Sequence, residues 1–138
     1  MALQQGATDA FATGLMNGVY NFTSGSFKVA LYTGSATLGP DTSVYTSSNE
    51  VVAAGYTAGG IALPVSVAPT SSNNVSYISF SNVTWNAALT ARGALIYQSG
   101  GVNPTVCVLD FGSDKTSSAT FTIQFPTANS TDAIIRIT

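Results

Sequence analysis

Apolar residues recur with a period of two along most of the chain, and this pattern predicts an all-β fold. In residues 27–32 the apolar side chains of Phe27, Val29 and Leu31 alternate with the residues between them, as in a strand with one buried face. Residues 119–125 follow the same rule, with large apolar residues separated by Thr or Gln. The predicted strands are 27–32, 51–54, 61–67, 75–83, 92–98, 105–111, 119–125 and 133–137.

Corners rich in Gly, Pro and Asn separate these strands at short intervals. Gly permits positive φ and Pro presets φ, so each cluster is typical of a turn. Strands that follow one another without alternating helices favour antiparallel pairing. We therefore predict one domain over residues 1–138, with an N-terminal arm at 1–25 and a two-sheet antiparallel β-sandwich at 26–138. The predicted corners are 33–35, 39–41, 55–60, 69–74, 100–101, 112–114 and 126–130.

A helical period occurs in residues 7–20, inside the predicted arm. Phe11, Leu15 and Val19 are spaced four apart, and Asp9 suits a first turn. Gly14 weakens the pattern, because glycine disfavours a helix interior. We expect one short helix in this arm.

The surface is expected to be polar but nearly uncharged. Charged residues make up 7% of the chain, against about 25% in typical soluble domains. The 17 Ser and 18 Thr residues take their place. Four basic residues at a net charge of −2 are too few to neutralise several phosphates, so nucleic-acid binding is excluded. No apolar run approaches the about 20 residues that span a bilayer, so no membrane association is expected.

The composition excludes most catalytic chemistry. Histidine is absent, and with it the commonest general base and metal ligand. The single cysteine, Cys107, rules out an intramolecular disulfide and a thiolate metal site, and we expect it to be buried. The first six residues lack the features of a secretory signal, so we expect synthesis in the cytoplasm. We assign no catalytic, cofactor-binding or metal-binding residue and predict a protein that is not an enzyme.

Asp110 and Asp114 form the closest pair of carboxylates, and we place them at the end of one strand and in the next corner. Carboxylates in such a position commonly accept hydrogen bonds from turn amides. A calcium site is an alternative, since oxygen-rich turns suit that cation. A catalytic carboxylate pair is a further alternative.

Two tyrosines are candidates for a partner interface. Tyr56 lies in a corner between Gly55 and the Gly59–Gly60 pair, where a large ring either packs inward or faces a partner. Tyr45 is the second candidate, because exposed tyrosines combine apolar area with a polar tip. Trp85 is expected in the core.

Two arginines complete the set of interface candidates. Arg92 enters a strongly apolar strand, so it either begins that strand at an exposed end or pairs with a carboxylate inside the fold or across an interface. Glu50 is one potential acceptor. Arg136 presents the same choice near the C-terminus, where a charge often protects an edge strand from unwanted pairing.

Four segments together resemble the capsid cement (decoration) proteins of tailed bacteriophages. They are residues 27–32, 55–60, 90–97 and 108–112, and the similarity extends from about residue 5 to the C-terminus. The resemblance implies a jelly-roll β-sandwich that binds the outer surface of an HK97-type capsid in the virion. It also implies a homodimer that bridges neighbouring subunits of the major capsid protein, with no catalytic residues.

Two other classes of function stay open on the sequence. A receptor- or glycan-binding domain of a phage head or tail fibre would use exposed aromatics such as Tyr45 and Tyr56. A carboxylate-dependent hydrolase would depend on Asp110 and Asp114.

Overall fold

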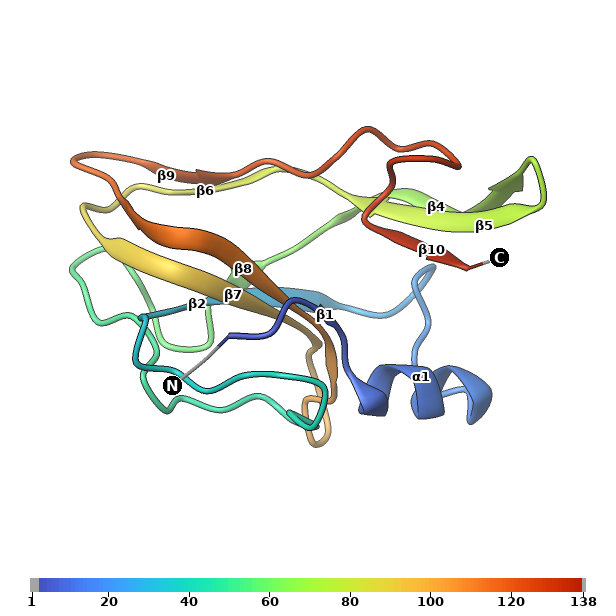
Figure 1. Ribbon diagram of the computed structural model, residues 1–138, viewed down its shortest axis with the longest axis horizontal. Helices are drawn as coiled ribbons and strands as arrows, with labels where there is room; N and C mark the ends of the chain where they lie inside the picture. The colour runs from blue at the N-terminus through green and yellow to red at the C-terminus, as the bar shows by residue number, and fades with distance from the viewer. Residues whose placement is uncertain (1–2, 138) are drawn as a thin grey trace.

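The computed structural model describes residues 3–137 and arranges their strands in two layers (Figure 1). All named strand pairs are antiparallel, so the predicted all-β class is confirmed for the described chain. The lower layer is a five-stranded sheet with the order β1 (Gly6–Ala7), β8 (Thr105–Thr116), β7 (Thr90–Gln98), β2 (Phe27–Tyr32) and β3 (Ile61–Ala62). The upper layer contains two smaller sheets. One is three-stranded, with the order β10 (Ile135–Ile137), β5 (Val75–Phe80) and β4 (Val65–Ser72); the other is the pair β6 (Val83–Trp85) and β9 (Phe121–Ile123).

The main hydrophobic core lies between the two layers. Trp85 is 4% exposed and packs edge-to-face on Phe121, so its predicted core position is confirmed. The alternation predicted for residues 119–125 is also correct, because Phe121 and Ile123 are buried while Thr122 is exposed. The lower layer contributes Phe27, Val29, Leu31, Ile96 and Val106 to this core, and the upper layer contributes Ile78, Phe80, Val83, Trp85, Phe121 and Ile123.

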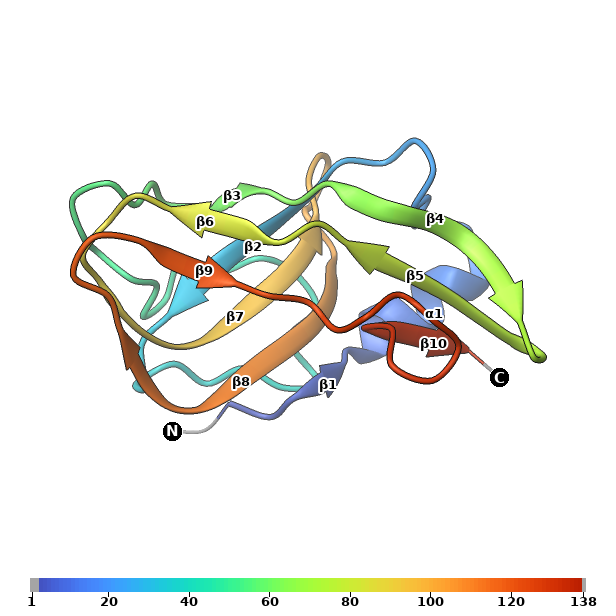
Figure 2. The ribbon, with the colours of Figure 1, turned by 90° about the horizontal axis from the view of Figure 1, so that it is seen from above.

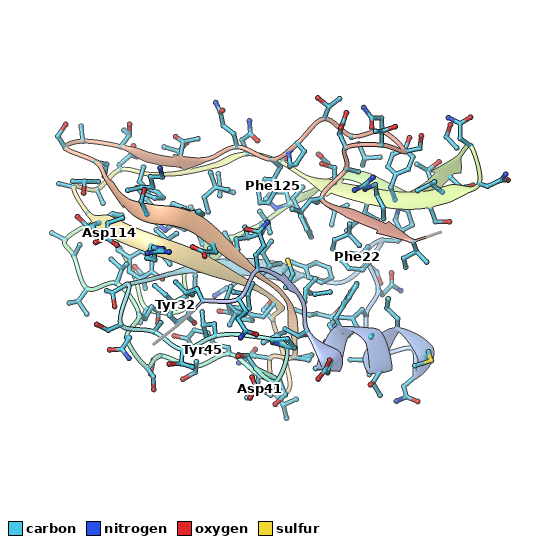
Figure 3. The ribbon with its side chains drawn as sticks, viewed as in Figure 1. Phe22, Tyr32, Asp41, Tyr45, Asp114 and Phe125 are labelled. Atoms are coloured by element: carbon cyan, nitrogen blue, oxygen red, sulfur yellow. The ribbon has the colours of Figure 1, made fainter. Side chains whose placement is uncertain are left out.

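A second, smaller core covers the opposite face of the five-stranded sheet. Ala30 and Tyr32, which the alternating pattern places on a polar face, are both fully buried there. The loop between β2 and β3 lies over this face and brings Ala36 and Leu38 against them. Figure 3 shows Tyr32 and Tyr45 on this side of the sheet, away from the upper layer. The central strands are therefore buried on both faces, which explains why β7 is almost continuously apolar.

The predicted helix is confirmed as α1 (Asp9–Met16). Thr8 caps it by accepting a hydrogen bond from the Phe11 amide at 3.1 Å. Gly14, which weakened the sequence pattern, has a packing role. A Cβ atom at this position would come within 2.3 Å of the Tyr20 ring, so glycine lets Tyr20 pack against the helix.

Of the predicted strands, 51–54 is absent from the structure and 61–67 is divided. The causes are a contact with β2 and a proline. Residues 51–54 form no strand; instead the Val51 amide donates to the Leu31 carbonyl at 2.9 Å. Residues 61–67 divide into β3 and β4 at Leu63 and Pro64, since proline has no amide to continue a ladder. The division lets the chain leave the lower layer and enter the upper one.

Two further predictions placed strand boundaries incorrectly. Residues 75–83 divide into β5 and β6, which belong to different strand pairs. The predicted corner at 112–114 lies inside β8, where Gly112 has a φ of 85° and the register with β7 shifts between Ala91 and Gly93. Glycine here permits a bulge rather than a chain reversal.

The β4–β5 hairpin extends past the end of the five-stranded sheet, over α1 (Figures 1 and 2). Its tip is a two-residue turn of Asn73 and Asn74, both with positive φ, as the twist of a tight hairpin requires. The predicted corner at 69–74 is therefore shorter in the structure, and Pro69 lies within β4 where its register with β5 shifts. Beneath this hairpin, α1 and β10 face each other.

Candidate functional site

Glu50 is buried and accepts hydrogen bonds from two tyrosines and one backbone amide. Its exposed fraction is 7%. Tyr45 donates to Oε1 at 2.5 Å, and Tyr56 donates to Oε2. The Gly59 amide also donates to Oε2, at 2.8 Å. We call these four residues the Glu50 clasp, because they join three parts of the loop between β2 and β3.

The clasp closes the edge of β2 where β3 ends. β3 pairs only with Lys28 and Val29 of β2, so the Leu31 amide has no strand partner on that side. Tyr56 supplies one, since its hydroxyl oxygen accepts from the Leu31 amide at 2.9 Å. A buried amide without an acceptor is destabilising, so the Tyr56 hydroxyl takes the place of a sheet carbonyl.

The tyrosines of this region stay protonated, as donors to Glu50 require. Burial raises the pKa of the Tyr56 hydroxyl, and its hydrogen bond to Glu50 raises it further. The same two causes, burial first, raise the pKa of Tyr45. Burial also raises the pKa of Tyr97, whose hydroxyl donates to the Gly59 carbonyl at 2.5 Å. The arrangement suits a structural role, because the carboxylate is occupied by donors from its own chain.

The structure corrects the expectation that Tyr56 faces a partner. Its side chain is 9% exposed and its ring lies 6.2 Å from that of Trp85, inside the main core. A buried carboxylate, which the local sequence pattern did not reveal, provides the polar partner that lets the hydroxyl point inward. Tyr45 is half-buried and its ring packs at a tilt against Tyr97, with centroids 4.9 Å apart, so its ring is not fully exposed either. The structure thus brings Tyr45 and Tyr56 together on Glu50.

Arg92 pairs inside the fold, but with Asp110 rather than with Glu50. The Arg92 Nε lies 3.0 Å from the Asp110 Oδ1, across the β7–β8 pair. Arg92 also lies within β7 rather than at its exposed start. The hydrogen bond from the Gly112 amide lowers the pKa of Asp110 most, and the bond from Arg92 lowers it further.

The calcium alternative for Asp110 and Asp114 gains no support from the structure. Figure 3 shows Asp114 toward the end of the sheet far from α1. Within residues 3–137, no group of three His, Cys, Asp or Glu side chains is placed to hold a metal ion. Asp110 is already engaged by a guanidinium and an amide.

The Asp110 bonds predict a stability difference that depends on pH. A carboxyl whose pKa is lowered in the folded state stabilises the fold above its ordinary value of 3.8, and loses this effect as pH falls through the lower folded value. We expect Asp110→Asn to lower the free energy of unfolding at pH 7 by no more than about 1 kcal/mol, because the pair is partly exposed. The difference from wild type should shrink below pH 4. Urea unfolding followed by Trp85 fluorescence measures it, with the exposed Asp41→Asn as control; a difference that grows toward low pH would contradict the assignment.

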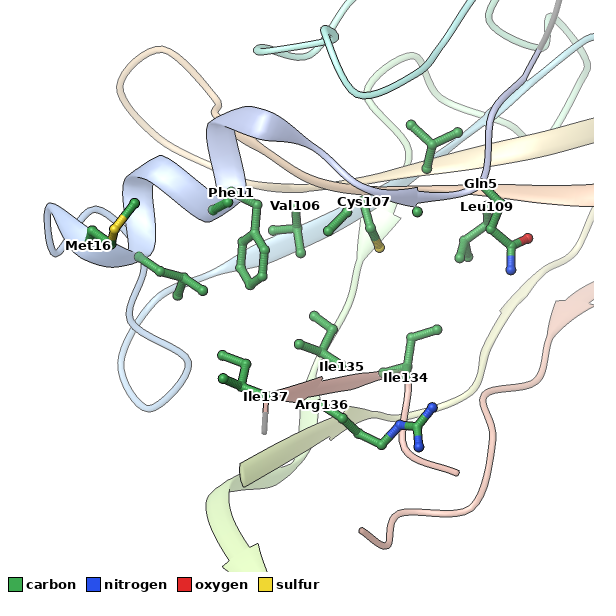
Figure 4. Close-up of a pocket in the computed structure, with 15 residues that line it drawn as sticks. Gln5, Phe11, Met16, Val106, Cys107, Leu109, Ile134, Ile135, Arg136 and Ile137 are labelled. Carbon is green, nitrogen blue, oxygen red and sulfur yellow. The ribbon is translucent and has the colours of Figure 1, made fainter. Parts of the chain in front are cut away.

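An apolar cleft of about 620 Å³ opens between α1, β1 and β8 on one side and β10 on the other. Figure 4 shows the two walls facing each other, with Phe11, Val106 and Cys107 opposite Ile135 and Ile137. Cys107 is 7% exposed, as predicted, and burial raises the pKa of its thiol to about 12, so the thiol is unreactive at neutral pH. A smaller hollow of about 190 Å³ continues from the cleft beneath β5. The volume of the main cleft, about 620 Å³, is typical of ligand sites.

Arg136 is the predicted interface residue that lies at this cleft. It is exposed on β10, an edge strand, which is one of the two alternatives that the sequence left open. Figure 4 shows its side chain directed away from the apolar walls. The sequence did not predict the cleft, because its walls come from three separate segments, α1, β8 and β10, that only the fold brings together. The isoleucines around Arg136 were the available signal, but they are equally typical of a core strand.

No protein-family model, curated protein or solved structure matches this chain. Within the described part of the chain, no helix has the length and apolar character to cross a bilayer.

Proposed function

We propose that the protein is a virion structural protein, a cement protein on the outer surface of an HK97-type capsid of a tailed phage. In this proposal a homodimer bridges neighbouring subunits of the major capsid protein. A jelly-roll type of β-sandwich is part of the same proposal, supported by two antiparallel layers whose pairs, such as β2–β7 and β6–β9, join strands distant in sequence.

The observation that carries the proposal is that every strand of the upper layer except β10 lacks a charged residue. Residues 51–91 contain no charged side chain, and neither do residues 116–131, so β4, β5, β6 and β9 are all uncharged. Their exposed positions include Ser66, Thr84 and Thr122. Interface cores are depleted in charge because an ion must lose its hydration on binding. The hydroxyl-rich, uncharged surface of these four strands avoids this penalty.

The absence of an evident catalytic centre supports a structural role. The chain has no histidine, and its carboxylates Glu50 and Asp110 are bound by donors of the same chain. The surface therefore has to perform the function. The glycan-binding alternative loses its motivation, since Tyr56 is buried and Tyr45 is bound to Glu50.

Cement action follows from mass action at the seams of the shell. A protein that binds across a seam of the assembled capsid stabilises the assembled state by its binding free energy. Many copies act in parallel, and a bivalent dimer raises the effective concentration of each second contact. Each single contact can then be modest.

Virions that lack the protein test the proposal. We expect them to release DNA at a lower temperature and under milder osmotic shock than complete virions. Purified protein added back should restore resistance to heat and to osmotic shock. The number of copies per virion provides a second measurement, with hundreds, in fixed ratio to the capsid protein, expected. Equal stability with and without the protein, or only a few tens of copies, would contradict a cement role.

A further inference from the structure

The apolar cleft lies where both sheets end in an open edge. β10 pairs with β5, and β1 pairs with β8; neither has a second strand partner among residues 3–137. Residues of both edges line the cleft, including Gly6 of β1 and Ile135 of β10. An open edge presents unpaired backbone donors and acceptors, which an added strand can satisfy.

We propose that this cleft receives an extended segment of another protein as an added strand on β10. The segment carries an acidic residue opposite Arg136 and apolar residues on both sides of it. The inference rests on the proposed function in one respect, since it takes the segment to belong to the capsid protein.

Strand geometry fixes the pattern of the added segment. Opposite residues of neighbouring strands point to the same face of a sheet, and successive residues point to opposite faces. Ile135 and Ile137 point into the cleft, and Arg136 points away from it (Figure 4). An added strand therefore places one residue beside Arg136, and its two neighbours in the cleft against walls that include Phe11 and Val106.

Arg136 also determines which kind of strand fits. It forms no ion pair with any described residue, so its charge is available to a partner. When two copies of β10 pair antiparallel in full register, their Arg136 side chains lie opposite each other, and like charges in that position are destabilising. The edge is thus protected against a second copy of itself and complementary to a strand with a carboxylate. The occupant is a different chain, and a homodimer would use another surface.

Peptide titrations of the full-length, isotope-labelled protein test the inference. The probe is a blocked seven-residue peptide with Glu at its centre, Ile on both sides of Glu and Ser elsewhere; the matched peptide has Lys at its centre. We expect the Glu peptide to shift the amide resonances of residues 135–137 and to slow their hydrogen exchange. It should bind about two- to fivefold more tightly than the Lys peptide, as expected for an exposed ion pair.

Charge reversal supplies the decisive comparison. Arg136→Glu should reverse the preference, so that the Lys peptide binds more tightly. The exposed Lys115→Glu makes the same change in net charge away from the cleft, so this variant should still prefer the Glu peptide. Equal binding of both peptides to all three proteins would overturn the inference. If self-association protected the amides of residues 135–137 from exchange in the absence of peptide, the inference would also be overturned, because a second copy of the chain would then be the occupant.

Binding to virions separates this inference from the proposed function. If wild type and Arg136→Glu decorate and stabilise virions equally, the cement role stands and the β10 site is wrong. If the Glu peptide binds at β10 but the protein does not bind virions, the site stands and the cement role is wrong.

Discussion

Replacing Glu50 by alanine is expected to lower the free energy of unfolding by about 3–5 kcal/mol, because it leaves one buried and two half-buried donors without an acceptor. The hydroxyls of Tyr45 and Tyr56 and the Gly59 amide all donate to this carboxylate. None of them reaches water easily, since Tyr56 is 9% exposed and Tyr45 is half-buried. The variant also loses the connection that holds the loop between β2 and β3 against the sheet. Urea unfolding at neutral pH, followed by Trp85 fluorescence, measures the change.

Milder variants assign this loss to the hydrogen bonds rather than to the missing side-chain volume. Glu50→Gln keeps the size but has one acceptor oxygen, so we expect it to lose about 1–3 kcal/mol. A double-mutant cycle of Glu50→Gln with Tyr45→Phe should show coupling, because the two groups share one bond. Asp41 is exposed and holds no set of buried donors, so Asp41→Asn should change stability by less than about 0.5 kcal/mol. If Glu50→Ala were as stable as Asp41→Asn, the stabilising role of the Glu50 clasp would be contradicted.

The strands could be predicted where local chemistry and tertiary structure agree. β2, β7 and α1 carry their own periodic patterns and turn signals, and the structure has them within a few residues of the predicted bounds. The strand boundaries that were predicted wrongly depend on contacts with distant segments. Gly112 has the composition of a turn, but β7 continues beside it and converts the turn into a bulge. Pairing of this kind is not encoded in the local sequence.

The candidate sites were harder to predict because each depends on contacts between distant residues. Glu50 was considered only as an acceptor for Arg92, whereas Asp110, eighteen residues from Arg92, is the acceptor in the structure. Tyr56 has the neighbours of an exposed corner residue, and only the folded position of Glu50 explains why it is buried. An edge charge was one of two alternatives for Arg136, since a charge among isoleucines near a chain end is a local signal. The cleft beside it required the fold.

Gly60→Ala is expected to be the most damaging small substitution in the chain, with a loss of more than about 4 kcal/mol or a failure to fold. Gly60 has a φ of 84°, which already costs an alanine about 1–2 kcal/mol. A Cβ atom there would also lie 1.9 Å from the Val29 carbonyl oxygen and 2.8 Å from the Ala30 Cα. Both atoms belong to the backbone of β2, which β7 holds along its full length, so neither can move away without breaking the sheet. Thermal unfolding and the dispersion of the amide spectrum measure the effect.

Gly101→Ala isolates the steric part of this loss. Gly101 also has a positive φ, 60°, but a Cβ atom there would meet nothing within 4 Å. The backbone strain is therefore similar in the two variants, and we expect Gly101→Ala to lose only about 1–2 kcal/mol. Equal stability of the two variants would mean that β2 and the loop at Gly60 are not in contact. The Glu50 clasp would then also be in doubt, because Gly59, the neighbour of Gly60, donates its amide to Glu50 and is fixed by the same approach to β2.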